Sequence, residues 1–175
     1  MHSSTKKRRL MNIPAKVDTS ALFKAIVVDE DYQEFKRDPA NLRLAYHLGL
    51  GLFHLRDWTF WEYGGTSTMP YSTMGCYQTY LESQCKDFGY IRDLANAVKH
   101  VELDPSKRPS TQMVGLANTK VSFAAFSSTA FQPNAFKTKT VIVSQTSPTD
   151  YVDFDKAADA VMSMWNRLFS TNGWK

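Results

Sequence analysis

The sequence predicts an α-rich α+β domain: four to five helices, a small C-terminal β-hairpin or short sheet, and a final helix. Three observations predict this class. Apolar residues recur at helical spacing through the first hundred residues, β-branched and aromatic residues dominate after about residue 110, and helical spacing returns at the C-terminus. A chain of 175 residues suffices for one domain with a core, so we expect a single domain over 18–175.

The helical part is predicted to span 18–104 and to hold four helices, at about 20–36, 39–63, 76–84 and 86–103. Asp38 is a good N-cap for the second helix, Pro39 suits its first position, and the glycine pair 64–65 ends it. Its apolar spine predicts a central helix. Gly49 and Gly51 within it predict either a close approach of a neighbouring helix or a kink, because each costs about 1 kcal/mol relative to alanine.

The remaining part, 105–175, is predicted to form the hairpin and the last helix. Two segments rich in β-branched and aromatic residues are the expected strands, KVSFAAF (120–126) and TKTVIVSQ (138–145). The segment 146–150 has the composition of a turn. Asp153 or Asp155 is the expected cap of the final helix, and Gly173 is its expected end.

The net charge of +4 comes from the N-terminal tail, 1–17, which we expect to be disordered. This tail holds five of the 21 basic residues and none of the 17 acidic ones: Lys6, Lys7, Arg8, Arg9 and Lys16. The rest of the chain is therefore close to neutral, which argues against a basic nucleic-acid-binding face spread over the fold. The tail itself is typical of a solubilising terminus, a contact with nucleic acid or an acidic partner, or a localisation signal.

Several protein classes are disfavoured by what the sequence lacks. No apolar run approaches the roughly 18–20 residues of a membrane span, so we expect no membrane association. Cys76 and Cys85 are too few for a disulfide scaffold, which favours a cytoplasmic protein with free thiols. Neither a phosphate-binding loop nor a dinucleotide motif is present, and no histidine stands at metal-ligand spacing. We therefore expect no metal and no cofactor.

The stretch YIRDLANAVKH, 90–100, carries the main candidate site. Its apolar residues fall on one side of a helix, and the other side is predicted to present Arg92, Asp93, Asn96, Lys99 and His100. A histidine can transfer a proton near neutral pH, an arginine can hold a phosphate, and an asparagine can orient either group. These groups suit metal-independent cleavage of RNA. The same residues are also ordinary on a solvated helix face, and the sequence leaves both interpretations open.

An arginine, a polar residue and then a histidine on a late helix of a helical domain resemble the HEPN superfamily. Its active members are metal-independent ribonucleases of toxin and antiviral-defence systems, with the motif at a homodimer interface. The resemblance covers about 18–104 and implies catalytic roles for Arg92, Asp93 and His100, with Asn96 beside them. Seven residues separate Arg92 from His100, more than is usual in that family. The alternative function is a non-catalytic helical module that binds a protein partner.

Two further groups of residues are candidates for binding. Arg43, His47 and His54, with Asp57, are predicted to line a polar groove that faces the fourth helix and to bind substrate together with Lys99. The repeated Arg-Asp pairs in HLRDW and YIRDL also permit a structural role, in which each arginine meets acids of a neighbouring helix. The segment DWTFWEY, 57–63, predicts core packing at a helix end, or else a partner-binding or base-stacking edge.

Overall fold

The computed structural model of the chain describes residues 16–100, 119–122, 140–147 and 150–175. Its elements follow one another as α1 (Ser20–Phe23), η1 (Lys24–Val28), α2 (Asp29–Arg37), α3 (Leu42–Tyr63), α4 (Met74–Gln84), α5 (Asp87–His100), β1 (Thr119–Ser122), β2 (Thr140–Ser147), β3 (Asp150–Asp153) and α6 (Phe154–Asn172). The predicted α-rich α+β class is confirmed. The basic tail before residue 16 lies outside the described residues, as does the end of the first predicted strand, 123–126.

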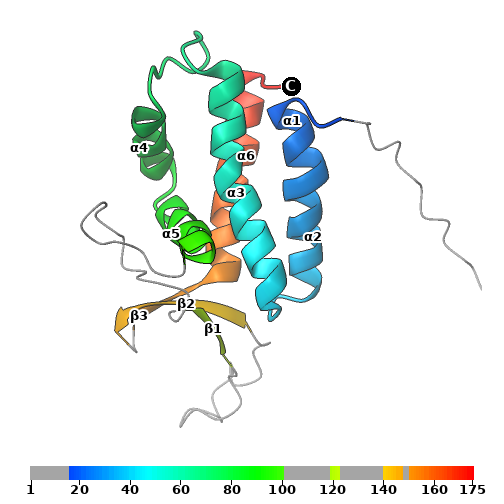
Figure 1. Cartoon of the computed structure of the whole chain (residues 1–175), viewed down its shortest axis with the longest axis vertical. Helices are drawn as coiled ribbons and strands as arrows, with labels where there is room; N and C mark the ends of the chain where they lie inside the picture. Colours follow the sequence, from blue (N-terminus) through cyan, green and yellow to red (C-terminus); the bar gives the residue numbers. More distant parts are fainter. Residues whose placement is uncertain (1–15, 101–118, 123–139, 148–149) are drawn as a thin grey trace, which may run out of the picture.

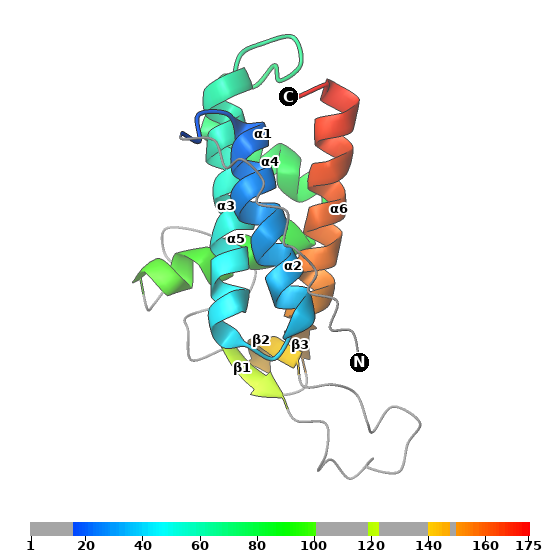
Figure 2. The same cartoon turned by 90° about the vertical axis from the view of Figure 1, so that its right-hand side faces the viewer.

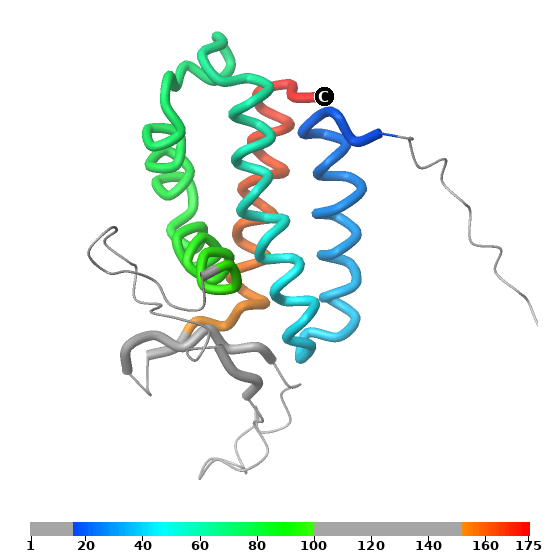
Figure 3. The backbone as a smooth tube through the Cα atoms, in the orientation of Figure 1, coloured from blue at the N-terminus to red at the C-terminus, as the bar shows by residue number. Residues whose placement is uncertain are grey.

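Helix α3 stands at the centre of the helical layer (Figure 1). Helix α2 runs antiparallel to it on one side, α4 and α5 lie on the other, and α6 runs parallel to it behind (Figures 1 and 3). Helix α5 crosses α3 steeply, as the view turned by 90° shows (Figure 2). The sheet closes the end of the bundle at which α6 begins (Figure 1).

The first predicted helix is confirmed as one continuous helical rod made of α1, η1 and α2. Thr19 caps it, because its hydroxyl accepts the Leu22 N–H at 3.1 Å. The five residues of η1 form a π-helix. Lys24 Nζ reaches Asp29 Oδ1 at 2.7 Å, a spacing of five residues that places both side chains on one side of this wider turn.

The long central helix is confirmed, although its first residue differs from the prediction. Asn41, and not Asp38, is the N-cap, and its side chain accepts the Leu44 N–H. The backbone N–H of Asp38 instead bonds to Phe35 at the end of α2, so this residue belongs to the preceding helix. The helix ends at Tyr63 as predicted, and Gly65 follows with a φ of +76°.

Gly49 lets α5 approach α3 closely, which confirms one of the two predictions for this residue. A Cβ atom at Gly49 would lie 3.0 Å from Leu94 Cδ2, tighter than ordinary van der Waals contact. Gly51 faces the other way, toward η1, where a Cβ would lie 3.5 Å from Val28 Cγ2. The two glycines therefore play different parts, although they are two residues apart on one helix.

The predicted hairpin is part of a three-stranded sheet. Strands β1 and β2 pair antiparallel, as expected, with Val121 opposite Val141. Strand β3 pairs antiparallel with β2 on its other edge and was not predicted. It covers Asp150–Asp153, and four residues are too few for an alternating pattern to be recognised. The predicted turn at 146–150 is therefore shorter than expected, because β2 extends to Ser147 and β3 begins at Asp150. Asp153 caps α6 and Gly173, with a φ of +64°, ends it, both as predicted.

The core lies between α3, α5 and α6. Trp165 is its largest fully buried side chain, and its indole N–H donates to the Leu52 carbonyl oxygen at 3.1 Å. Phe88 of α5 packs against Trp165 edge to face. Among the described residues, no helix is both long enough and apolar enough to cross a membrane.

Candidate functional site

The predicted polar stripe of α5 is wrong for two of its five residues. Arg92 is 5% exposed and Asp93 is 2% exposed, so both lie inside the fold. The physical reason is a second packing surface: besides the core side, α5 presents Arg92 to α4, where Glu82 receives it. A helix can bury a charged face when a neighbouring helix supplies the opposite charge.

The other members of the stripe are less enclosed. Asn96 is half-buried and Lys99 is exposed. The side chain of His100 lies outside the described residues. The structure therefore brings Arg92 and Asp93 together within the fold and leaves Asn96 and Lys99 toward the surface on the following turns of α5.

Arg92 is held by two carboxylates. Its Nη1 donates to Glu82 Oε1 at 2.5 Å, and its Nε donates to Asp93 Oδ1 at 2.8 Å. The Arg92 side chain is 6% exposed, and Glu82, at 31%, is the more solvated of its partners. Hydrogen bonds between ionised groups in a partly water-free setting are the strong ones, so this contact fixes α5 against α4.

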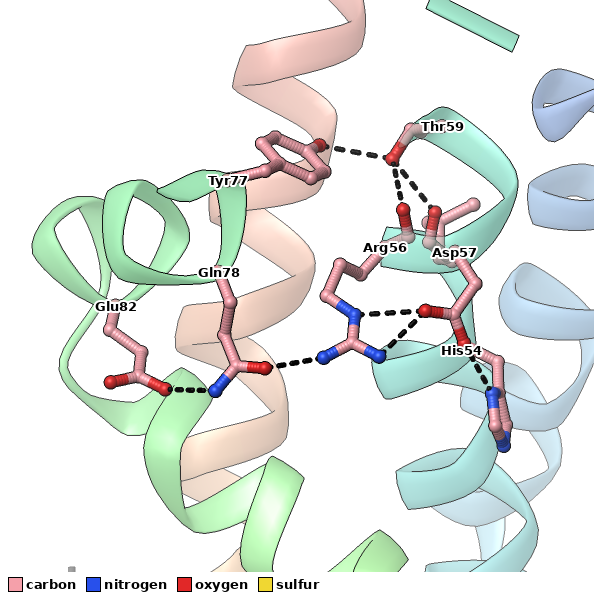
Figure 4. A network of polar contacts seen from close by, with 8 residues as sticks. His54, Arg56, Asp57, Thr59, Tyr77, Gln78 and Glu82 are labelled. Carbon is pink, nitrogen blue, oxygen red and sulfur yellow. Dashed lines mark hydrogen bonds and ion pairs between the residues drawn. The ribbon is translucent and has the colours of Figure 1, made fainter. Parts of the chain in front are cut away.

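A polar network continues from this pair to α3. Gln78 Nε2 donates to Glu82 Oε1 at 3.0 Å, and Arg56 Nη1 donates to Gln78 Oε1 at 2.5 Å (Figure 4). We call the whole chain of contacts the α3–α5 network; in order it contains His54, Asp57, Arg56, Gln78, Glu82, Arg92 and Asp93. The prediction that each arginine meets an acid of a neighbouring helix is confirmed for Arg92, which pairs with Glu82, and is wrong for Arg56, whose partner on α4 is the amide of Gln78.

His54 and Asp57 form the solvent end of the α3–α5 network. His54 Nδ1 lies 2.9 Å from Asp57 Oδ2, and Arg56 Nε and Nη2 donate to Asp57 Oδ1 at 2.9 and 2.6 Å (Figure 4). Burial alone would raise the pKa of Asp57, but the hydrogen bonds from His54 and Arg56 outweigh burial and lower that pKa. Asp57 is therefore an ionised carboxylate at neutral pH.

Arg43 and His47 do not join the α3–α5 network. Both are exposed, and both act electrostatically on Asp31 of α2. Burial raises the pKa of Asp31, whereas the nearby His47 and Arg43 lower it and Glu34 raises it, with a net increase. The predicted groove facing α5 is thus wrong for Arg43 and His47, which are exposed and act on Asp31 of α2. Of the predicted groove residues, His54 and Asp57 belong to the network.

The aromatic segment DWTFWEY separates into buried and exposed parts. Phe60 stacks on Tyr77 and Tyr63 stacks on Trp174, with ring centroids 6.0 and 5.2 Å apart, which is core-type packing. Trp58 stacks on Phe23 at 5.0 Å. Trp61 is 75% exposed and is the exposed large hydrophobic residue among the described side chains.

Trp61 lies at an open groove that the sequence did not reveal. The groove has a volume of about 420 Å³. Its walls come from α3 and from the segment that precedes α1: Lys16, Val17, Asp18, Asp57, Trp58 and Trp61. We call it the aromatic groove. Asp57 belongs both to this groove and to the α3–α5 network, so the two features meet at one carboxylate.

Gln78 and Glu82, which link Arg56 to Arg92, were not predicted as site residues. Their spacing of four residues on the third predicted helix, beside two Arg-Asp pairs, was the available signal. Within the described ranges no group of three or more histidines, cysteines and acids is placed to hold a metal ion. Comparison with family models, with curated proteins and with solved structures finds no match.

Chemically, the two features differ. In the α3–α5 network the charged side chains pair with one another, and these pairs hold the helices together. The aromatic groove instead offers indole surface, the solvated carboxylate of Asp18 and open volume to a second molecule.

Proposed function

We propose that the chain is a non-catalytic helical module that binds another protein, with the aromatic groove as its binding surface. The observation that carries this proposal is Trp61, a large apolar side chain that is 75% exposed beside a groove of about 420 Å³. Tryptophan is enriched among the residues that contribute most to protein–protein binding. An exposed indole beside an open groove fits such a contact.

The state of Arg92 supports the same proposal. A ribonuclease that used this stripe would turn the guanidinium toward a phosphate. Here the side chain is 6% exposed and is paired with Glu82 and Asp93. Its charge stabilises the contact between α4 and α5, so it is engaged before any substrate arrives.

Site-specific photocrosslinking tests the proposal. A benzophenone amino acid at position 61, in the protein expressed in its own host, is expected to give a discrete protein adduct. The matched control carries the same group at Asn166, which is exposed on α6 and away from the groove residues. Equal adducts from positions 61 and 166 would overturn the proposal, as would metal-free RNA cleavage by the purified chain.

An RNA-directed, HEPN-like function is the second candidate. The observation that favours it is that the α3–α5 network joins His54 to Arg92 and Asp93, three of the residues expected to take part. In that case Asn96 and Lys99, nearer the surface of α5, would meet the RNA, and a homodimer would complete the site.

Incubation of the purified protein with a mixed RNA pool in EDTA separates the two candidates. Cleavage that is lost in His54→Ala and Asn96→Ala, with both variants still folded, would establish the second candidate. Intact RNA, with a specific adduct at position 61, would support the first.

A further inference from the structure

One face of α3 is left uncovered by the described part of the fold. Helix α2 lies on one side of α3, α4 and α5 lie on the other, and α6 lies behind it, so the face toward the viewer is open (Figure 1). Side chains on this face recur at alternating steps of four and three residues, within an arc of about 80°. We call this set the α3 stripe: Arg43, His47, Leu50, His54, Asp57 and Trp61.

The α3 stripe has the spacing and the exposure of a helix-contact surface. All six of its side chains are exposed or partly exposed, and exposure reaches 75% at Trp61. Alternating steps of four and three residues keep one line of contact along a second helix. From Arg43 to Trp61 the stripe extends over about 27 Å, so it offers a second helix several turns of contact.

The two ends of the α3 stripe differ chemically and complement each other. Arg43 lies at the end where α3 begins, and Trp61 lies at the end where it stops. When a second copy of α3 lies antiparallel about a two-fold axis at position 52, each residue meets the one equally far beyond that position. The facing pairs are then Arg43 with Trp61, His47 with Asp57, and Leu50 with His54.

These facing pairs are favourable, and the two-fold axis makes each of them twice. The guanidinium of Arg43 over an exposed indole at Trp61 forms a cation–π contact. Asp57 keeps one acceptor site for an N–H of His47, because a carboxylate has about four such sites and the bonds within the chain fill three of them. A parallel contact would instead set Arg43 against Arg43, like charge against like charge.

We infer that a second copy of this chain is the partner of the aromatic groove, bound by an antiparallel, two-fold contact between the α3 stripes. Asp57 and Trp61 belong to both surfaces, so this contact covers the groove. The inference rests on the proposed function, since it names the partner of the same surface. The stripe is much smaller than a standard interface of roughly 20–30 residues a side, so the dimer is weak, with a Kd on the order of tens of micromolar.

Sedimentation equilibrium of the full chain, up to about 500 µM, tests for this dimer. We expect a monomer–dimer equilibrium that Arg43→Glu weakens at least about tenfold, because each dimer loses two cation–π contacts. The matched control is Arg167→Glu, an equal charge change at an exposed arginine of α6, which is expected to leave the Kd within about twofold. Single chains at every concentration would overturn the inference, and so would equal weakening in the two variants.

Photocrosslinking measures which residues face each other. Chains with a benzophenone amino acid at position 61 are mixed in a ¹⁵N-labelled and an unlabelled form, so that a contact between copies gives peptide pairs with one labelled member. We expect attachment to the second copy within one turn of Arg43. Attachment centred on position 61, or on an element other than α3, would overturn the antiparallel contact, including attachment on α5, where the HEPN-like candidate would place its homodimer.

The failure of this inference differs from that of the proposed function. If the inference holds, the adduct formed at position 61 in the host has twice the mass of the chain. An adduct with a different protein, and none with a second copy, would overturn the inference and leave the proposed function standing. Equal adducts from positions 61 and 166 would overturn both.

Discussion

Arg92 on α5 and Glu82 on α4 form an ion pair in which Nη1 donates to Oε1 at 2.5 Å. The pair sits where a helical wheel of α5 predicts solvent, and it explains why this side of the helix is covered. Because Glu82 also accepts from Gln78, and Gln78 from Arg56, the same contact is transmitted to α3. The positions of α4 and α5 on the central helix thus depend on a few charged side chains as well as on apolar packing.

Removal of the Arg92 charge is therefore expected to destabilise the fold. We expect Arg92→Met to lower the free energy of unfolding by about 2–4 kcal/mol, since methionine fills much of the space but leaves Asp93 and Glu82 without the guanidinium. Urea denaturation followed by circular dichroism measures the change. Lys99→Met on the same helix is the control: this lysine is exposed, and its change is expected within about 0.5 kcal/mol. Equal stability of Arg92→Met and the parent would contradict a structural role for the pair.

The elements of this fold could be predicted because their signals are local. Thr19, Asp153 and Gly173 sit at helix ends for reasons that lie within a few residues of each. Strand β3 could not be predicted in the same way, because its stability comes from pairing with β2, a partner whose position four residues do not encode.

The candidate site was harder to predict, since it depends on which helix packs where. Periodicity separates the two faces of α5 but does not show that α4 covers the second one. Arg92 and Asp93 therefore looked like solvent-facing residues, although they are buried. Likewise, the sequence predicts core packing or a partner-binding edge for the segment 57–63 as a whole. The structure separates Trp58, which stacks on Phe23, from Trp61, which is 75% exposed.

Acid is expected to weaken the contact between His54 and Asp57. The pKa of Asp57 is lowered in the folded protein, so its contribution to stability is complete above its unfolded pKa of about 3.9 and is lost as pH falls through the folded value. We expect Asp57→Asn to be less stable than the parent at pH 7, by less than about 1 kcal/mol because the site is well solvated. The difference in unfolding free energy should begin to narrow as pH falls to about 3.9 and should close below the lowered folded pKa of Asp57.

Carboxyl-carbon NMR gives an independent measurement of the same residue. The Asp57 midpoint is expected below its ordinary value in the parent and closer to that value in His54→Ala, which removes one of the two residues that donate to the carboxylate. A midpoint that His54→Ala leaves unmoved would show that this histidine does not hold the carboxylate in solution.

The two glycines of α3 offer a matched test of the close helix contact. Gly51→Ala is expected to stabilise the protein by about 0.5–1 kcal/mol, because alanine favours the helix and its Cβ would sit 3.5 Å from Val28 in ordinary contact. Gly49→Ala gains the same propensity but places its Cβ 3.0 Å from Leu94. We expect it to be less stable than Gly51→Ala by about 1–2 kcal/mol, owing to overpacking against α5. Thermal unfolding of both variants measures the difference, and equal effects would contradict the close approach.

Trp58 and Trp61 should differ sharply in their contributions to stability. Trp58→Ala is expected to lower the free energy of unfolding by about 2–3 kcal/mol, because it removes an indole stacked on Phe23 at 5.0 Å. Trp61→Ala is expected to change it by less than about 0.5 kcal/mol, since this side chain is 75% exposed. Urea denaturation of both variants measures the two changes in unfolding free energy. A large loss in Trp61→Ala would mean that the indole serves the fold, whereas a negligible loss leaves binding as the reason for a tryptophan at this exposed position.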